Sequence, residues 1–174
     1  MVQLRILECF RLHLRNSFVF FAVLLLLAVL YFYKKYNVAP SVDFAKLDLQ
    51  YLDGERVNWQ DFKGKKLVVS LGASWCGNCR EELKELSKVK DTKLEDVEVV
   101  VISDEPMEKV QRFSEMYSYP YIYLKLNQPF PSIGINSIPT TYIINTALEV
   151  QEEQVGYIDW SDASTVEHLH KLMD

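Results

Sequence analysis

The chain has 174 residues, enough for about one domain, and it is 49% hydrophobic and 25% charged. Six glycines and six prolines exclude a collagen-like or largely disordered chain, and three cysteines are too few for a small disulfide-stapled scaffold. The net charge of −5 provides no overall basic surface of the kind that nucleic-acid binding needs, so we expect no nucleic-acid partner.

The charge is divided unevenly along the chain. Residues 1–33 carry a formal charge of +2, and residues 34–174 carry −7. Within the first part, residues 17–33 contain no charged side chain, and their number is near the lower limit for a helix that spans a bilayer. The segment runs into Tyr-Phe-Tyr-Lys-Lys, which is a poor cleavage site. It therefore favours an uncleaved signal-anchor over a cleaved signal peptide or a buried core helix.

These features predict four parts of the chain. We expect a cytoplasmic flank at 1–16, a transmembrane helix at 17–33, a linker at 34–42 and a folded domain at 43–174. The positive-inside rule favours the N-terminus in the cytoplasm, which places the domain on the far side of the bilayer. Residues 17–33 then contact lipid, and Cys9, which precedes them, is expected to have no redox role.

Patterns of strand and helix alternate along the rest of the chain. We expect first a β-hairpin at 47–59 with its turn at Asp53-Gly54. A strand at 67–71, a helix from Cys79, a strand at 97–102 and a helix from Pro106 should follow. The remaining elements are strands at 121–124, 140–144 and 150–155 and a helix at 161–173. This order indicates an α/β fold with a central mixed sheet and helices on both faces.

The spacing of apolar residues also predicts which helix faces are buried. On the helix after Pro106, Met107, Val110, Phe113 and either Met116 or Tyr117 should face the core. Ser164 and Glu167 have the spacing of a capping box in the last helix. The acidic residues of the helix after Cys79 are expected on a solvated face; these are Glu81, Glu82 and Glu85.

Cys76 and Cys79 carry the chemistry that the sequence predicts. They are separated by two residues and lie at a junction between a strand and a helix. The N–H groups and dipole at the start of the helix favour negative charge, so we expect a lowered pKa for the Cys76 thiol. Cys76 is then the attacking thiol, and Cys79, one turn away, resolves the mixed disulfide.

Two other roles for the cysteine pair stay open. A zinc site needs two more ligands, and the candidates are Cys9 and His13, which lie across the proposed membrane, and His168 and His170, which point to different sides of a helix. A purely structural disulfide is the second alternative. We expect a redox-active Cys76–Cys79 disulfide with no metal and no bound cofactor.

The segment Gly72–Arg80 resembles the active-site motif of the TlpA/ResA-like, membrane-anchored thiol–disulfide oxidoreductases of the thioredoxin superfamily. Residues 137–144 are similar to the strand that carries their cis-proline, and the resemblance covers residues 44–173. It implies a thioredoxin-like fold with an N-terminal β-hairpin and a βα insertion. It also implies a cis Pro139 opposite Cys76 and a backbone site for substrate at Ile138.

The resemblance also implies supporting residues, with two departures from the thioredoxin pattern. Trp75, Gly77 and Asn78 complete the active-site loop, although thioredoxins have proline where this chain has Asn78. Ser70 stands where thioredoxins have a buried acid. TlpA/ResA-like proteins often use a glutamate after the next strand, so Glu105 is expected to accept the proton of Cys79. Asp104 beside it leaves the register open.

The expected function is thiol–disulfide exchange. The resemblance implies an enzyme of the bacterial cytoplasmic membrane that reduces or exchanges protein disulfides on the periplasmic or extracytoplasmic side, as in cytochrome c maturation. Its partners are disulfide or dithiol proteins and a membrane or periplasmic thiol electron donor. One alternative is a peroxiredoxin-like peroxidase, which needs threonine where the chain has Ala73. A copper-binding chaperone is the other, and it needs His168 or His170 near the cysteines.

Overall fold

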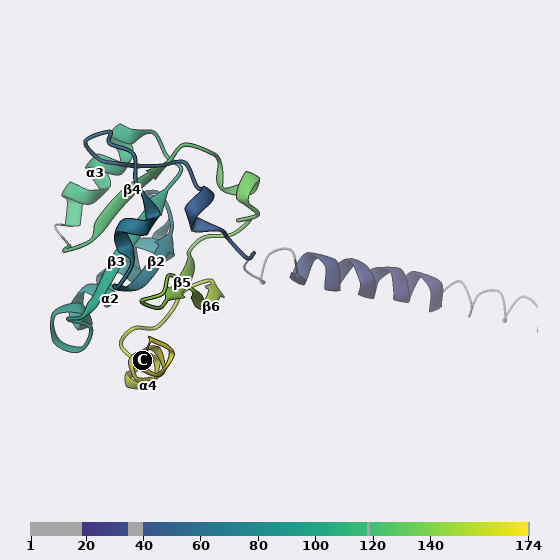
Figure 1. Ribbon diagram of the computed structural model, residues 1–174. Coiled ribbons are helices and arrows are strands. Elements are labelled where there is room, and N and C mark those ends of the chain that lie inside the picture. Colours follow the sequence, from purple (N-terminus) through teal and green to yellow (C-terminus); the bar gives the residue numbers. More distant parts are fainter. Residues whose placement is uncertain (1–18, 35–39, 118, 174) are drawn as a thin grey trace, which may run out of the picture. The chain divides into compact units, whose positions relative to one another are not determined.

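The computed structural model describes residues 19–34, 40–117 and 119–173 (Figure 1). It divides into two units, Met1–Tyr36 and Asn37–Asp174. In the first unit, residues 19–34 form a helix whose large apolar side chains are exposed. The predicted flank at 1–16 and residues 17, 18 and 35–39 lie outside the described residues. Among those that are described, no helix has the combined length and hydropathy of a membrane span.

The second unit is built on one mixed sheet of six strands in the order β1-β4-β3-β2-β5-β6. The central strands β2, β3 and β4 run parallel to each other, whereas β1–β4, β2–β5 and β5–β6 are antiparallel pairs. The mixed α/β sheet that the sequence predicts is therefore confirmed. The strands are β1 (Leu49–Tyr51), β2 (Lys66–Leu71), β3 (Val97–Ser103), β4 (Ile122–Leu126), β5 (Thr140–Ile144) and β6 (Val150–Val155).

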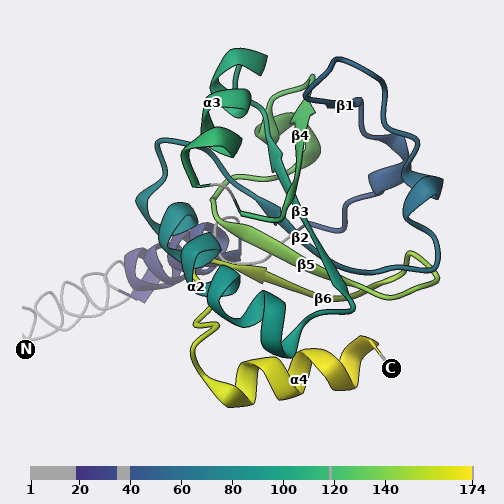
Figure 2. The same ribbon diagram turned by 90° about the vertical axis from the view of Figure 1, so that its left-hand side faces the viewer.

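Different kinds of helix cover the two faces of this sheet (Figure 2). The α-helices α2 (Gly77–Lys93), α3 (Met107–Tyr117) and α4 (Ala163–Met173) pack on one face. Three short 3-10 helices pack on the other, at Phe44–Lys46, Trp59–Phe62 and Phe130–Ile133. Helices lie on both faces as predicted, but the α-helices of this unit share one face.

The apolar spacing correctly locates the buried side of the helices. Leu83, Leu86 and Val89 of α2 are buried. The alternative between Met116 and Tyr117 on α3 is settled by packing, because Tyr117 lies against the core and Met116 is 61% exposed. This leaves Met116 on the surface.

The predicted hairpin at 47–59 is only partly formed. β1 pairs with β4, and beyond the turn the chain makes one isolated bridge, between Gln50 and Arg56. A 3-10 helix then begins at Trp59, capped by Asn58, whose side chain accepts a hydrogen bond from the Gln60 N–H. Burial of Trp59 by stacking on Phe44, with 4.8 Å between ring centroids, explains why the second arm does not continue as a strand.

Two further boundaries differ from prediction. The last helix starts at Ala163, and the Asp162 carboxylate accepts the Ser164 N–H, so Asp162 performs the capping expected of Ser164. The packed unit also extends into the predicted linker. The Tyr142 hydroxyl donates to the Pro40 carbonyl at 2.7 Å, and Val42 is buried.

Candidate functional site

The cysteine pair lies at the end of the most buried part of the sheet. Residues Leu67–Leu71 of β2 are almost completely buried, between β3 and β5. The chain then turns, and the Cys76 N–H donates to the Ala73 carbonyl at 3.0 Å. Cys76 is the N-cap residue of α2. A rigid central strand and a helix N-terminus therefore fix the position of this loop from both sides.

Cys76 and Cys79 form a disulfide with Cα atoms 5.3 Å apart. The Cys76 sulfur also accepts the Cys79 N–H at 3.1 Å. Cys76 is 7% exposed and Cys79 is 1% exposed, so the Cys76 sulfur is the one that solvent and a partner reach. When the disulfide is reduced, the helix N–H groups remain in position to stabilise a thiolate on Cys76.

Gly72 and Ile138 pack directly against the sulfur atoms. A Cβ added at Gly72 would lie 3.2 Å from the Cys79 Sγ, so glycine permits the close packing of β2 against this cysteine. Ile138 packs on the cluster of Ala73, Cys76 and Cys79. The Ile138–Pro139 peptide bond is cis, as the resemblance implies. No described residue bonds to the backbone N–H or C=O of Ile138.

The other loop residues named from the resemblance face solvent. Gly77 and Asn78 are exposed in the first turn of α2, and Trp75 is 69% exposed. The Trp75 indole is therefore a large apolar surface next to the reactive sulfur. Such a surface is available for contact with another molecule.

Glu105 is buried beneath the loop that precedes Cys76. Its carboxylate accepts the Ser74 N–H at 2.6 Å and the Ser74 hydroxyl at 2.9 Å. The Ser103 hydroxyl lies 3.4 Å from the same carboxylate, and the Lys109 ammonium lies 3.9 Å away. Both carboxylate oxygens are thus occupied in holding Ser74. This arrangement fixes the loop two residues before the attacking cysteine.

The structure resolves the register that Asp104 left open. The Asp104 carboxylate accepts the Phe130 N–H at 2.9 Å and so holds the 3-10 helix at Phe130–Ile133. Glu105, and not Asp104, contacts the active-site loop.

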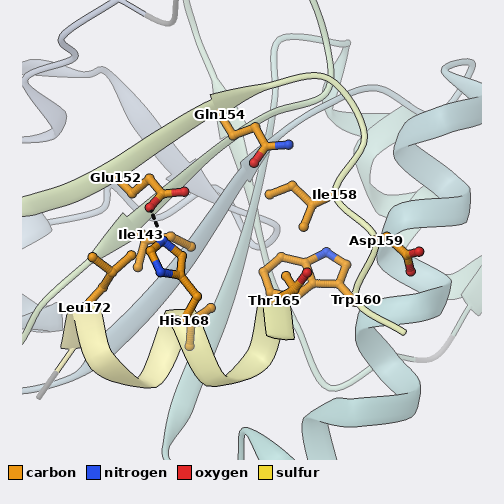
Figure 3. A pocket seen from close by; sticks show the side chains of 10 residues that line it. Ile143, Glu152, Gln154, Ile158, Asp159, Trp160, Thr165, His168 and Leu172 are labelled. Atoms are coloured by element: carbon orange, nitrogen blue, oxygen red, sulfur yellow. Dashed lines mark hydrogen bonds and ion pairs between the residues drawn. The ribbon is translucent and has the colours of Figure 1, made fainter. Parts of the chain in front are cut away.

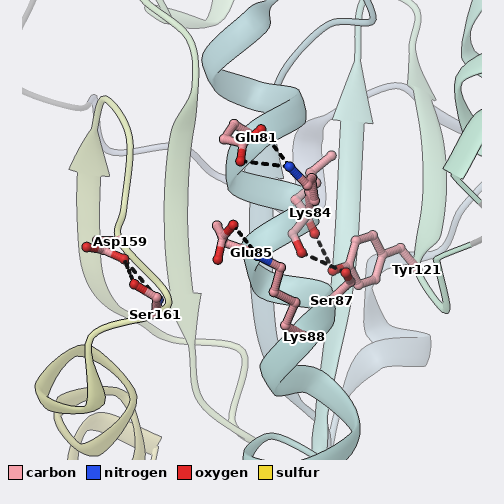
Figure 4. A network of polar contacts seen from close by, with 9 residues as sticks. Glu81, Lys84, Glu85, Ser87, Lys88, Tyr121, Asp159 and Ser161 are labelled. Atoms are coloured by element: carbon pink, nitrogen blue, oxygen red, sulfur yellow. Dashed lines mark hydrogen bonds and ion pairs between the residues drawn. The ribbon is translucent and has the colours of Figure 1, made fainter.

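A second buried carboxylate, Glu82, was wrongly expected on a solvated face. Glu82 is 1% exposed, whereas Glu81 and Glu85 pair with Lys84 and Lys88 at the surface of α2 (Figure 4). Its oxygens accept the Thr141 hydroxyl and the Ile158 N–H, both at 2.9 Å. The spacing of three residues after the buried Cys79 was the signal that places it on the inner side of the helix.

Burial raises the pKa of Glu82 to about 7. Loss of water around the carboxylate is the main cause, and the hydrogen bonds from Ile158 and Thr141, with a contribution from Trp160, lower the pKa in part. Thr141 of β5 pairs with Ser70 of β2. Thioredoxins have a buried acid at the position of Ser70. In this chain the buried acid in that part of the interior is Glu82, which projects from α2.

Both histidines of the domain have partners away from the cysteines. The His168 ring nitrogen lies 2.6 Å from the Glu152 carboxylate in a pocket between β6 and α4 (Figure 3). The His170 ring nitrogen lies 2.8 Å from the carbonyl of Lys93, at the end of α2 opposite Cys76. The described residues contain no group of three His, Cys, Asp or Glu side chains placed to hold a metal ion.

Comparison with known proteins agrees with this geometry. The AhpC/TSA family profile matches residues 37–153. The chain belongs to this family. It is 28% identical over 131 residues to the thioredoxin-like protein YneN of Bacillus subtilis, covering 71% of this chain and 75% of YneN. It is 29% identical over 112 residues to the thiol-disulfide oxidoreductase ResA of Halalkalibacterium halodurans, covering 62% of this chain and 64% of ResA.

A solved structure supports the fold. A thioredoxin-family thiol:disulfide interchange protein from Chlorobium tepidum aligns with a TM-score of 0.57 and 22% identity, covering 75% of this chain and 94% of that one. Within its family, the chain is thus a TlpA/ResA-like member of the thioredoxin superfamily. With its disulfide at the start of α2, it is a protein-disulfide oxidoreductase.

The raised pKa of Glu82 makes a prediction about stability. Its ordinary pKa of 4.5 applies to the unfolded chain, and the folded value is about 7. Between pH 4.5 and about 7, Glu82 therefore carries a proton in the folded protein but not in the unfolded chain. As pH rises through this range, Glu82 lowers the free energy of unfolding by about 3 kcal/mol in total. Glu82→Gln should remove this loss, because an amide keeps a partner for both Ile158 and Thr141.

Urea unfolding of the full chain at pH 5 and pH 8 measures the effect. The stability of Glu82→Gln relative to the unmodified protein should rise between these pH values. Glu85→Gln, a change at the surface of the same helix, serves as the control. Parallel pH dependence in all three proteins would contradict a buried, destabilising carboxylate at position 82.

Proposed function

We propose that this protein is anchored in the bacterial cytoplasmic membrane and reduces or exchanges the disulfides of other proteins on the extracytoplasmic side. The observation that carries the proposal is the position of Cys76. It is the more accessible cysteine of a disulfide at the N-terminus of α2, and the backbone of Ile138 beside it, next to the cis peptide bond, bonds to none of the described residues. This arrangement fits attack on a disulfide held in an extended peptide.

The reaction starts from the reduced protein. The Cys76 thiolate attacks one sulfur of the substrate disulfide, which forms a mixed disulfide and releases the other substrate sulfur as a thiolate. The Cys79 thiolate then attacks the Cys76 sulfur. The Cys76–Cys79 disulfide forms, the second substrate thiol leaves, and two electrons have passed from the protein to the substrate. A thiol electron donor at the membrane or in the periplasm restores the dithiol, and the same steps run in reverse for oxidation.

The two buried carboxylates divide the supporting roles. Cys79 must lose a proton before it attacks, and it is shielded from water. Glu82 lies one helical turn further along the buried side of α2, and its pKa of about 7 suits a group that takes up and releases a proton near neutral pH. We assign proton acceptance to Glu82. Glu105, first expected in that role, has both oxygens bound to Ser74 and positions the loop.

The location and substrate rest on the sequence. Residues 17–33 are uncharged, and the flank before them is basic whereas the domain is acidic. This pattern favours an anchor with the N-terminus in the cytoplasm. The resemblance to TlpA/ResA-like proteins favours apocytochrome c among the substrates, for which a peptide with a Cys-x-x-Cys-His disulfide is the appropriate probe.

Neither alternative function is favoured by a residue of the site. A peroxidase on this fold needs a threonine three positions before the attacking thiol, and the chain has the buried Ala73 there. A copper chaperone needs a histidine with the two cysteines, and His168 and His170 bond to Glu152 and Lys93 instead. Disulfide exchange uses both cysteines and both buried carboxylates of the site.

The roles of the two cysteines predict different effects of substitution. Cys76→Ser should abolish insulin reduction, because the attacking thiol is missing and the remaining Cys79 thiol is buried. Cys79→Ser should accumulate a mixed disulfide with the substrate, because the resolving thiol is missing. Mass spectrometry of the trapped complex measures this, and Cys9→Ser is the matched control that keeps full activity. Normal insulin reduction by Cys76→Ser would refute the assignment.

The two acids are distinguished by the pH dependence of the resolving step. Glu82→Gln should slow release of substrate from the mixed disulfide by about 10²-fold at pH 7 and move the pH profile to higher pH. Glu105→Gln should lower the rate without moving the profile. The measurement is stopped-flow release of the second substrate thiol from pH 5 to 9. A profile that moves in Glu105→Gln and not in Glu82→Gln would return the proton-accepting role to Glu105.

The proposed anchor is tested by the full chain with alkaline phosphatase fused to its C-terminus in a bacterial host. The phosphatase should be active, since it folds only outside the cytoplasm, and the fusion should stay with membranes after carbonate washing. Deletion of residues 17–33 should abolish both properties. An inactive fusion, or one released by carbonate, would contradict a single-pass anchor.

A further inference from the structure

A hollow next to the active-site loop has no role in the steps above. It has a volume of about 220 Å³ and is lined by Ser74 and by four residues of α3, which are Lys109, Arg112, Phe113 and Met116. Ser74 lies two residues before Cys76. The hollow therefore adjoins the same loop that carries the attacking sulfur.

The rim of the hollow is unusually apolar for this surface. In the described part of the second unit, the exposed large hydrophobic side chains are Trp75, Met116, Val150 and Tyr157. The two with the greatest exposure are Trp75 at 69%, which follows Ser74 in the active-site loop, and Met116 at 61%, which lines the hollow. Exposed apolar side chains that gather beside a reactive group are typical of a contact surface for a partner.

The same stripe of α3 is positively charged. Lys109, Arg112 and Met116 are spaced by three and four residues, which places them on one side of the helix. The Arg112 Nε–H donates to the backbone carbonyl of Glu108, and no described carboxylate pairs with its guanidinium. Lys109 has one carboxylate at 3.9 Å, that of Glu105, which already binds Ser74.

The residues that line the hollow include both cations and no acidic residue. Glu108 and Glu115 of α3 lie four residues before and three residues after Arg112, but neither carboxylate is paired with its guanidinium. Residues 34–174 together carry a formal charge of −7. The two cations adjoin the active-site loop of an otherwise acidic domain, where they attract acidic segments of a partner and repel basic ones.

We propose that this hollow, together with the exposed Trp75 of the adjoining loop, binds an acidic segment next to the disulfide of the substrate protein. Aspartate or glutamate side chains of the partner pair with Lys109 and Arg112, and an apolar side chain packs on Trp75 and Met116. The inference rests on the proposed disulfide exchange and adds a substrate class to it, namely disulfides flanked by acidic residues. The electron transfer is the one described above, from the Cys76–Cys79 dithiol to the substrate disulfide.

The experiment measures selectivity between peptides. Three peptides of equal length each contain one intramolecular disulfide and one leucine, and they differ only in three flanking residues, which are aspartate, asparagine or lysine. The full chain in nonionic detergent is reduced, freed of reductant and mixed with each peptide in a stopped-flow instrument. The second-order rate constant for oxidation of the protein is the readout.

The acidic peptide should react roughly three- to tenfold faster than the asparagine peptide, as expected for exposed ion pairs. The lysine peptide should be the slowest. The advantage should shrink as salt rises from 0.05 to 0.5 M. In the variant with Lys109→Gln and Arg112→Gln, the acidic-to-asparagine ratio should fall close to one. The control variant, Lys63→Gln with Lys93→Gln, also removes two exposed positive charges and should keep the ratio.

The outcomes separate the two proposals. Equal rates with all three peptides, or an acidic preference that survives in the Lys109/Arg112 variant, would overturn the docking surface and leave disulfide exchange intact. Loss of the acidic preference in the control variant would show that the preference comes from net charge. This result would also overturn the proposed docking surface. Failure to reduce any peptide, with insulin equally unreactive, would overturn the exchange activity itself.

Discussion

The site depends on one constraint, which is that a buried central strand holds the Cys76 sulfur at the N-terminus of α2. β2 is buried between β3 and β5, and its end sets the position of Gly72 and of the loop that follows. The N–H of Cys79, in the first turn of α2, then donates to the sulfur. Because the helix and the strand are both anchored in the core, the environment that favours a thiolate exists before any partner arrives. The loop is therefore already ordered when a partner binds, and none of the binding energy is needed to order it.

Two buried carboxylates complete this arrangement, and their different surroundings suit them to different work. Glu105 accepts two hydrogen bonds from Ser74 and ties the loop to the end of β3. Glu82 is enclosed by α2, β5 and the segment at Ile158, and burial raises its pKa to about 7. A carboxylate whose two oxygens already accept hydrogen bonds is suited to holding a loop. A carboxylate with a raised pKa is suited to exchanging a proton. In the mechanism that we propose, the same residue type thus fixes the loop in one position and accepts the proton in the other.

The sequence predicted the parts of the structure that depend on local patterns. The runs 67–71 and 97–102 appear as buried strands, and the sheet is mixed. The helix predicted from Cys79 is present and begins two residues earlier, at Gly77. Prediction failed where long-range packing decides. Trp59 stacks on Phe44, which ends the expected hairpin, and Glu82 is buried because Thr141 and Ile158, far away in sequence, supply its hydrogen bonds. The spacing from Cys79 places Glu82 on the inner side of the helix, but a charged residue on an amphipathic helix is usually solvated, and the prediction followed its charge.

The central claim is that the position of Cys76 makes it the reactive thiol. The most direct measurement is the alkylation rate of each cysteine in the reduced Cys9→Ser protein, followed by mass spectrometry of peptides from pH 4 to 10. The account predicts that Cys76 reacts first and that its reaction reaches half its maximal rate well below pH ~8.5, the value typical of a free cysteine. Cys79 should react more slowly at every pH. Faster alkylation of Cys79, or a Cys76 profile centred near pH ~8.5 like that of a free cysteine, would contradict the account.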